Sequence, residues 1–125
     1  MFKINKEDLS LHLTRGDDVV FSVQAMQGDK PYTFANGDVV TFKVSEAKYA
    51  GAVVLEETFT AIPGSDFVQL HLEGAKTKFG DVISKPVDYW YEISLTSNGG
   101  TQTIIGYDEQ GAKVLRLYPE LQKKE

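Results

Sequence analysis

The fold class that this 125-residue sequence predicts is all-β, a two-layer antiparallel sandwich. Three observations predict it: apolar and polar residues alternate with a period of two, turn-forming residues bound each alternating segment, and the segments follow one another at short spacing. The length suits one domain, and 42% of the residues are hydrophobic, enough for a core that needs no disulfide or metal. We therefore expect residues 1–125 to form a single sandwich domain.

The alternating segments predict about seven to eight strands. In order along the chain they are residues 9–13, 19–23, 40–44, 53–59, 68–72, 89–95, 101–105 and 113–118. Residues 53–59 alternate least regularly, and residues 19–23 most clearly, with Val19, Phe21 and Val23 in one phase. Between the segments lie glycine, proline, asparagine and aspartate, and Ser97-Asn98-Gly99-Gly100 is the best hairpin signal because Asn and Gly accept the positive φ of tight turns.

One polar segment, residues 72–79, lacks the alternation. Its sequence, Leu-Glu-Gly-Ala-Lys-Thr-Lys-Phe, lies between two predicted strands. We expect it to form a single short helical turn that crosses between the sheets.

The charge balance excludes several classes of partner. Acidic residues outnumber basic ones by 18 to 13, for a net charge of −5, whereas nucleic-acid and anionic-membrane binders need basic surfaces. No apolar run is long enough to span a bilayer, and residues 1–6 lack the apolar stretch of a signal peptide. We therefore expect no nucleic-acid or membrane partner, and a product made in a cytoplasm rather than secreted by a signal peptide.

No group of residues has the spacing of a catalytic, cofactor or metal site. The two histidines, His12 and His71, fall on the polar phase of their strands, and no HxH or HExxH pattern brings them together. The turn aspartates Asp17, Asp18 and Asp38 lack the ligand spacing of a calcium loop and are explained by hydrogen bonds to turn amides. With no cysteine, nucleophile elbow or phosphate loop in the chain, we expect a non-enzymatic protein without catalytic, cofactor or metal residues.

Aromatic residues supply the candidate interaction surface, which we assign to Trp90, Tyr107 and Tyr118. Trp90 alternates with Tyr89 and Tyr91, so it faces the opposite side of its strand. Two interpretations remain open: packing in the core or against another protein, which uses Trp and Tyr heavily, or stacking on a sugar ring.

Several segments together resemble a known family. They are residues 11–17 followed by Val19-Val20-Phe21, residues 36–44, residues 70–73 with Thr77 and Phe79-Gly80, and the Y-x-Y-x-I-x-L pattern of residues 89–95. This set of turns and strands is similar to the N-terminal domain of bacteriophage baseplate upper proteins and related phage and prophage tail structural proteins. The resemblance covers most of the chain.

The resemblance implies an immunoglobulin-like antiparallel β-sandwich that assembles with itself, as a homo-oligomer, or with neighbouring tail and baseplate proteins of a virion. It implies no catalytic residues. We accordingly expect a phage or prophage tail structural protein located in the virion, either a stand-alone relative of the family or a fragment of a longer one. The alternative is a carbohydrate- or cell-surface-binding sandwich that holds a glycan on its exposed aromatics.

Overall fold

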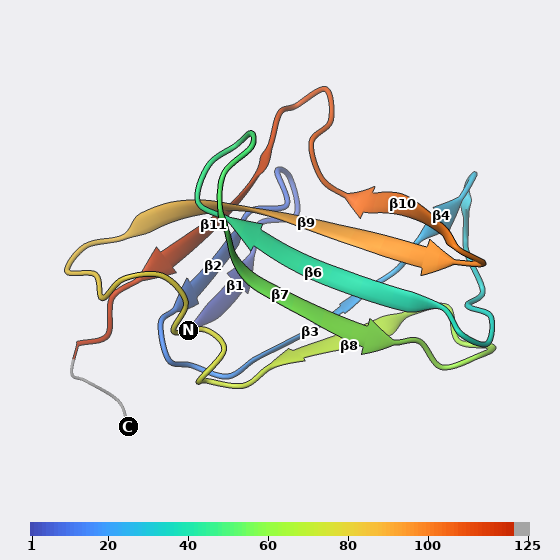
Figure 1. Cartoon of the computed structure of the whole chain (residues 1–125), viewed down its shortest axis with the longest axis horizontal. Coiled ribbons are helices and arrows are strands. Elements are labelled where there is room, and N and C mark those ends of the chain that lie inside the picture. Colours follow the sequence, from blue (N-terminus) through green and yellow to red (C-terminus); the bar gives the residue numbers. More distant parts are fainter. Residues whose placement is uncertain (122–125) are drawn as a thin grey trace.

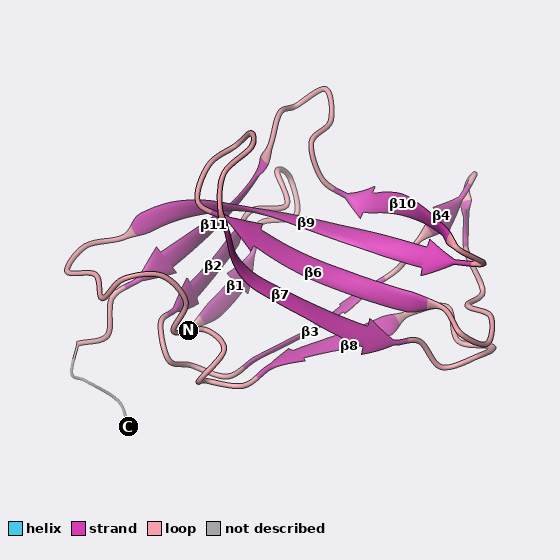
Figure 2. Cartoon of the chain, in the orientation of Figure 1, coloured by secondary structure: helices cyan, strands magenta, loops and turns pink. Residues whose placement is uncertain are grey.

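The protein is all-β in the computed structural model, which describes residues 1–121. Figure 1 shows the strands in order, and Figure 2 shows that loops connect them without a helix in the described residues. None of the described residues therefore form a helix that is long and apolar enough to cross a membrane. The strands are β1 (Phe2–Ile4), β2 (Leu11–Thr14), β3 (Val19–Val23), β4 (Met26–Gln27), β5 (Lys30–Pro31), β6 (Val39–Ser45), β7 (Val53–Thr60), β8 (Val68–Leu72), β9 (Val87–Ser97), β10 (Gly100–Ile105) and β11 (Lys113–Tyr118).

The prediction of an all-β fold is confirmed, and each alternating segment contains a strand, although Leu9 of the first segment lies before β2 with φ +59°. The predicted strand number was too low, because β1, β4 and β5 were not expected. These strands are two or three residues long, too short for alternation to be visible, and β4 and β5 flank a turn at Gly28, which has positive φ.

One large sheet and a separate two-stranded ribbon form the two layers. The large sheet has the order β1-β2-β11-β9-β6-β7, and β10 also pairs with β9. β10 and β11 lie along the same edge of β9, since β10 pairs with its second half and β11 with its first. The ribbon consists of β3 and β8 and lies beneath the large sheet in Figure 1.

The expectation of an entirely antiparallel sandwich is wrong at one pair of strands. β2 and β11 are parallel, with Leu11 beside Leu115 and Leu13 beside Leu117. All other strand pairs are antiparallel. This parallel contact joins segments about a hundred residues apart in the chain, and local alternation carries no information about such pairing.

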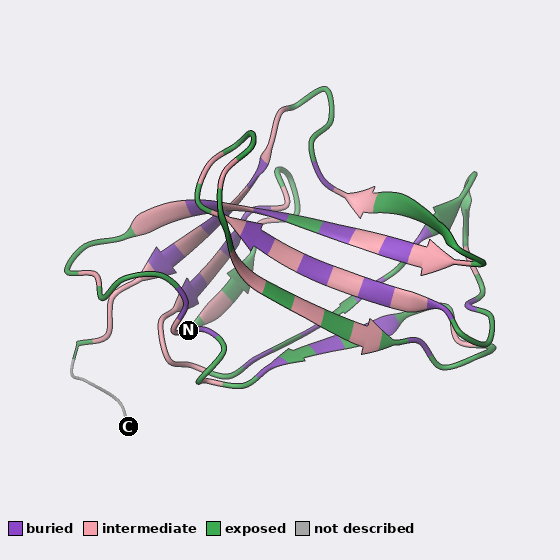
Figure 3. Cartoon of the chain, viewed as in Figure 1, coloured by how far each residue is buried: buried purple, intermediate pink, exposed green. Residues whose placement is uncertain are grey.

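The core lies between the large sheet and the ribbon. Along β6 and β9 buried residues alternate with partly exposed ones, as the banding in Figure 3 shows. Phe42 of β6 is fully buried, and its ring lies 6.0 Å from that of Phe21 on β3 and 5.8 Å from that of Tyr91 on β9. The ring of Phe2 also stacks on that of Phe21, with 5.4 Å between the ring centroids. These rings connect the two layers.

The helical turn expected within residues 72–79 is also wrong. Residues 73–77 form successive hydrogen-bonded turns, in which Lys76 N–H donates to Glu73 O and Thr77 N–H to Gly74 O. The amide of Gly74 instead donates to Asp18 Oδ1 at 2.6 Å. A Cβ at Gly74 would lie 2.5 Å from the carbonyl oxygen of Gly16. The close approach of these two loops therefore requires glycine at residue 74 and fixes the turn against the loop that contains Gly16 and Asp18.

Candidate functional site

The outer face of β2, β11 and β9 brings together two of the three residues predicted for an interaction surface. Residues paired across neighbouring strands share a face of the sheet. Trp90 lies beside Val114, and in the next row Arg116 lies between Asp88 and His12. Tyr118 follows on the same face, beside Thr14. We call this set the outer aromatic face: Trp90, Val114, Asp88, Arg116, His12 and Tyr118.

Trp90 is half-buried in this face, between Ser45 on β6 and Val114 on β11. The alternation predicted for its strand is confirmed, because Tyr89 and Tyr91 are buried on the inner side. The indole Nε1 of Trp90 is covered and has no hydrogen-bond partner among residues 1–121. A covered N–H donor that lacks a hydrogen-bond acceptor lowers the stability of an isolated fold. This donor lies on a partly exposed face of the sheet.

Arg116 and Asp88 form a bidentate ion pair in the middle of the outer aromatic face. The guanidinium Nε lies 2.7 Å from Asp88 Oδ1, and Nη2 lies 3.2 Å from Oδ2. The hydrogen bonds from Arg116 lower the pKa of Asp88, and the carboxylate in turn raises the pKa of Arg116. Both groups therefore remain charged at neutral pH, and the pair gives the face a flat polar centre that can stack against or hydrogen-bond to a partner.

Hydrogen bonds connect three side chains along the outer aromatic face, those of Ser10, His12 and Tyr118. His12 Nδ1 lies 3.2 Å from the hydroxyl of Tyr118, and His12 Nε2 lies 3.0 Å from Ser10 Oγ. The ring centroids of His12 and Tyr118 are 6.1 Å apart. A shallow pocket of about 250 Å³ opens beside these side chains, lined by Asn5, Asp8, Ser10, His12, Val114 and Arg116. These contacts fix the orientation of Tyr118 at the surface.

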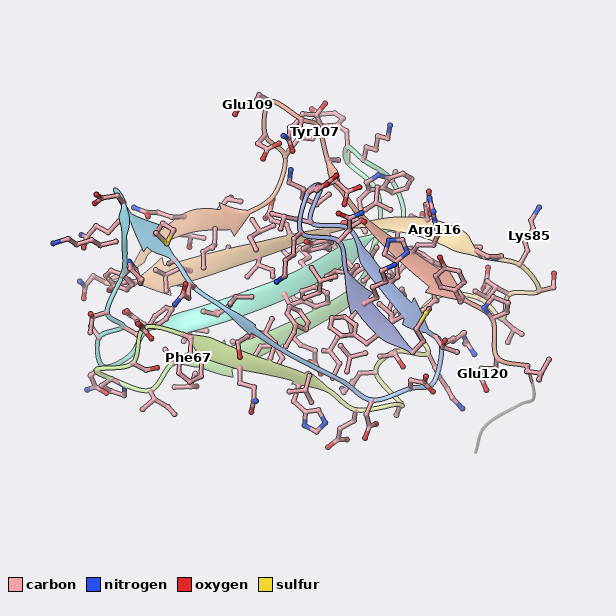
Figure 4. All side chains as sticks on the ribbon, turned by 180° about the vertical axis from the view of Figure 1, so that it is seen from behind. Phe67, Lys85, Tyr107, Glu109, Arg116 and Glu120 are labelled. Carbon is pink, nitrogen blue, oxygen red and sulfur yellow. The ribbon has the colours of Figure 1, made fainter. Side chains whose placement is uncertain are left out.

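Tyr107, the third predicted residue, does not join this face. It lies on the loop between β10 and β11 and is 71% exposed. An ion pair within the same loop region, Lys113 Nζ to Asp108 at 2.9 Å, anchors the loop and lowers the pKa of Asp108. Figure 4 shows Tyr107 near Glu109 on this loop, away from Arg116. Tyr107 is thus an isolated exposed aromatic.

Trp90 and Tyr118 are also well separated. Tyr118 follows Val114, the neighbour of Trp90, by four residues along β11, which corresponds to roughly 13 Å along a strand. Arg116 and His12 occupy the space between them, so the face is a mixed surface of aromatic, cationic and polar groups. The two histidines point outward as predicted: His12 is partly exposed here, and His71 is exposed on the ribbon.

Sequence reasoning missed Arg116, Asp88 and His12 as members of the face. Their proximity depends on the register of three strands, and no local signal reveals that register. Within residues 1–121, no three His, Asp or Glu side chains gather closely enough to hold a metal ion. The chain matches no protein-family model, and it matches no curated protein.

Proposed function

We propose that the protein is a non-enzymatic assembly module with an immunoglobulin-like sandwich, which self-associates through the outer aromatic face as a structural part of a phage or prophage tail. The observation that carries the docking role is the placement of Trp90, Arg116 and Tyr118 on one partly exposed sheet face. Trp, Tyr and Arg are the residues that most often dominate the energy of protein interfaces.

The strand order supports the immunoglobulin-like assignment. In that fold one sheet holds strands B and E, and the other holds C, F and G, with C′ added in the variable type. β3 and β8 correspond to B and E, β6 and β9 to C and F, β7 to C′, and the interrupted pair β10 and β11 to G. Their order along the chain follows the same sequence of letters, and the β4–β5 hairpin is inserted between B and C.

The phage setting rests on the sequence pattern alone. Its strongest segments are residues 36–44, which become the turn before β6 and β6 itself, and residues 89–95, which lie within β9. In both segments the family-like spacing coincides with turns and alternately buried positions. A tail structural role agrees with the self-association that the resemblance implies.

Light scattering on the purified full chain tests this proposal. We expect a stable oligomer, and we expect Trp90→Ala and Tyr118→Ala each to shift it towards the monomer. Tyr49→Ala is the matched control, because Tyr49 is an exposed aromatic on the β6–β7 loop, outside the face. A monomer at all accessible concentrations, or equal effects of all three variants, contradicts the docking role of the face.

A glycan-binding role is the competing outcome of the same experiment. A sugar ring needs an open aromatic platform, whereas Trp90 is half-buried and its Nε1 is covered. A monomer whose tryptophan fluorescence responds to glycans would replace the assembly proposal. An oligomer with no glycan response supports it.

A further inference from the structure

A second surface lies at the other end of β9, where β10 forms an unpaired sheet edge. Among residues 1–121, β10 pairs with β9 alone, in the register Gly100 to Ser97, Thr101 to Thr96 and Gln102 to Leu95. The connecting turn contains only Asn98 and Gly99, both with positive φ. This tight hairpin makes Ser97 and Gly100 a hydrogen-bonded pair, and hydrogen-bonded and non-bonded pairs then alternate.

It follows that the backbone N–H and C=O groups of Thr101 and Thr103 point away from β9. Both residues occupy non-bonded positions of the ladder, opposite Thr96 and Ser94. Outside that ladder, neither amide makes a backbone hydrogen bond within the described part of the chain. The free edge therefore offers two donors and two acceptors at the spacing of a strand.

The edge of β10 lacks the features that protect the other edges of the large sheet. On β7, Glu56 pairs with Lys43 at 3.7 Å and Glu57 pairs with Lys76 at 3.4 Å. β1 has only three residues and carries Lys3. β10 has six residues, with the sequence Gly-Thr-Gln-Thr-Ile-Ile, and contains neither a charge nor a proline. Charges and short length normally prevent unwanted strand pairing, so this edge remains available for pairing.

A slot of about 400 Å³ lies directly beside the free edge. Met26 and Gln27 of β4 form its opposite wall, and Tyr32 and Leu95 contribute to its lining. None of the residues that line it in the described part of the chain is charged. The β4–β5 hairpin thus borders the slot on the side that Met26 and Gln27 line, and Gly100, Thr101 and Gln102 of β10 line it as well.

One buried carboxylate close to the slot limits the charge that an occupant can carry. The carboxylate of Asp38 is buried and accepts hydrogen bonds from Tyr32 Oη at 2.8 Å and Ser97 Oγ at 2.6 Å, two residues that line the slot. None of the described residues that line the slot is charged, so a charged group entering it would lose its water without gaining a direct ion-pair partner, and an acidic group would also be repelled by Asp38 behind Tyr32 and Ser97. An uncharged segment with apolar side chains towards Leu95 and Tyr32 meets neither penalty.

We propose that the free edge of β10 and this slot bind an extended, uncharged segment of a partner protein, which adds to the large sheet as a further strand. The main-chain groups of Thr101 and Thr103 supply the hydrogen bonds, and the slot accommodates alternate side chains. This site is separate from the outer aromatic face, so either proposal can fail without the other.

Amide hydrogen exchange on the full chain tests the proposal, with the capped hexapeptide Ac-SVTITS-NH2 as the probe. At a peptide concentration about ten times its Kd, we expect exchange at Thr101 and Thr103 to slow by about tenfold. Gln102, whose amide already bonds to β9, serves as the internal reference and should change less. No protection at Thr101 and Thr103 overturns the proposal, as does protection that appears without peptide when the protein is concentrated, because the occupant would then be a second copy.

Two matched changes separate strand addition from nonspecific adsorption. Thr103→Pro removes one outward amide and should weaken peptide binding by at least about fivefold. Thr58→Pro is the control, because Thr58 is an exposed threonine whose amide also points away from its neighbouring strand, on the β7 edge. Equal loss in the two variants contradicts the assignment.

The peptide itself provides a test that needs no folded variant. N-methylation of the amides that would face β10, or replacement of Ile by Glu to give Ac-SVTETS-NH2, should abolish the protection in the wild-type protein. Binding of these altered peptides with unchanged affinity would show that neither the backbone ladder nor the uncharged slot recognises the segment.

Discussion

Truncation of Phe42 to alanine tests how the two layers are held together. Phe42 is the residue of β6 whose ring contacts both the ribbon, through Phe21, and β9, through Tyr91. It is fully buried, so the truncation removes apolar contacts on every side. Thr41, the preceding residue, faces outward in the same strand and provides the matched control.

Phe42→Ala should lower the free energy of unfolding by about 4 kcal/mol, which is within the range for truncating a buried aromatic side chain to alanine. Two ring contacts at 6.0 and 5.8 Å place the value above the minimum of that range. A domain of this size has a total unfolding free energy of about 5–15 kcal/mol. Phe42→Ala therefore removes a large fraction of it, whereas Thr41→Ala should cost less than about 1 kcal/mol.

Urea unfolding followed by circular dichroism measures both variants, and the slope of the transition should not change. If Phe42→Ala does not fold, Phe42→Leu supplies a smaller step of roughly 1–2 kcal/mol. A one-residue slip of β6 would exchange the faces of the two side chains. A larger loss for Thr41→Ala than for Phe42→Ala would therefore refute the register.

Three further predictions concern polar groups and turns. Hydrogen bonds, of which that from Ser97 has the largest effect, lower the pKa of Asp38 below its unfolded value of about 3.9. The ionised carboxylate therefore stabilises the fold above about pH 3.9, and this stabilisation is lost as the pH falls through the lower pKa of the native state. Asp38→Asn should therefore flatten the decline in unfolding free energy between pH 6 and pH 2, and an unchanged decline would count against this role. A double-mutant cycle on Arg116 and Asp88 should give a coupling of about 0.2–1 kcal/mol, because both side chains are more than one third exposed, and a value above about 2 kcal/mol would contradict the screening. Gly99→Ala should destabilise the β9–β10 hairpin by about 1 kcal/mol in thermal unfolding because Gly99 has φ +81°, and no loss would contradict the turn geometry.

The strands of this fold are predictable where burial alternates within a single segment. Val19, Phe21 and Val23 are buried and the residues between them are exposed, so the pattern is visible without any knowledge of the partner strand. The hairpin at Asn98-Gly99 is predictable for a similar reason, because the turn requires positive φ at both positions. Local chemistry determines these features.

Pairing between distant strands is not predictable in this way. His12 and Tyr118 are hydrogen-bonded although 106 residues separate them, because β2 lies parallel to β11. No periodicity within either strand indicates that arrangement. The outer aromatic face was therefore only partly foreseen: Trp90 and Tyr118 were identified from residue type, whereas Arg116 between them depends on register.

The prediction for Tyr107 shows the limit of residue type as a guide. Tyr107 is an aromatic residue like the other two candidates, Trp90 and Tyr118. It lies, however, on a loop that the Asp108–Lys113 ion pair fixes. The short strand β4 was missed in the same way, and with it the slot beside β10. The position of Tyr107 and the slot beside β10 both depend on how the loops pack against the large sheet.

Trp90 is the only tryptophan of the chain, so its fluorescence reports directly on the outer aromatic face. Under the proposed function, this face becomes buried when the protein assembles. As protein concentration rises, we expect the emission of Trp90 to shift to shorter wavelength and its quenching by acrylamide to decrease, in parallel with the mass measured by light scattering. A rise in mass without any change in the fluorescence of Trp90 would place the interface elsewhere and contradict the burial of this face.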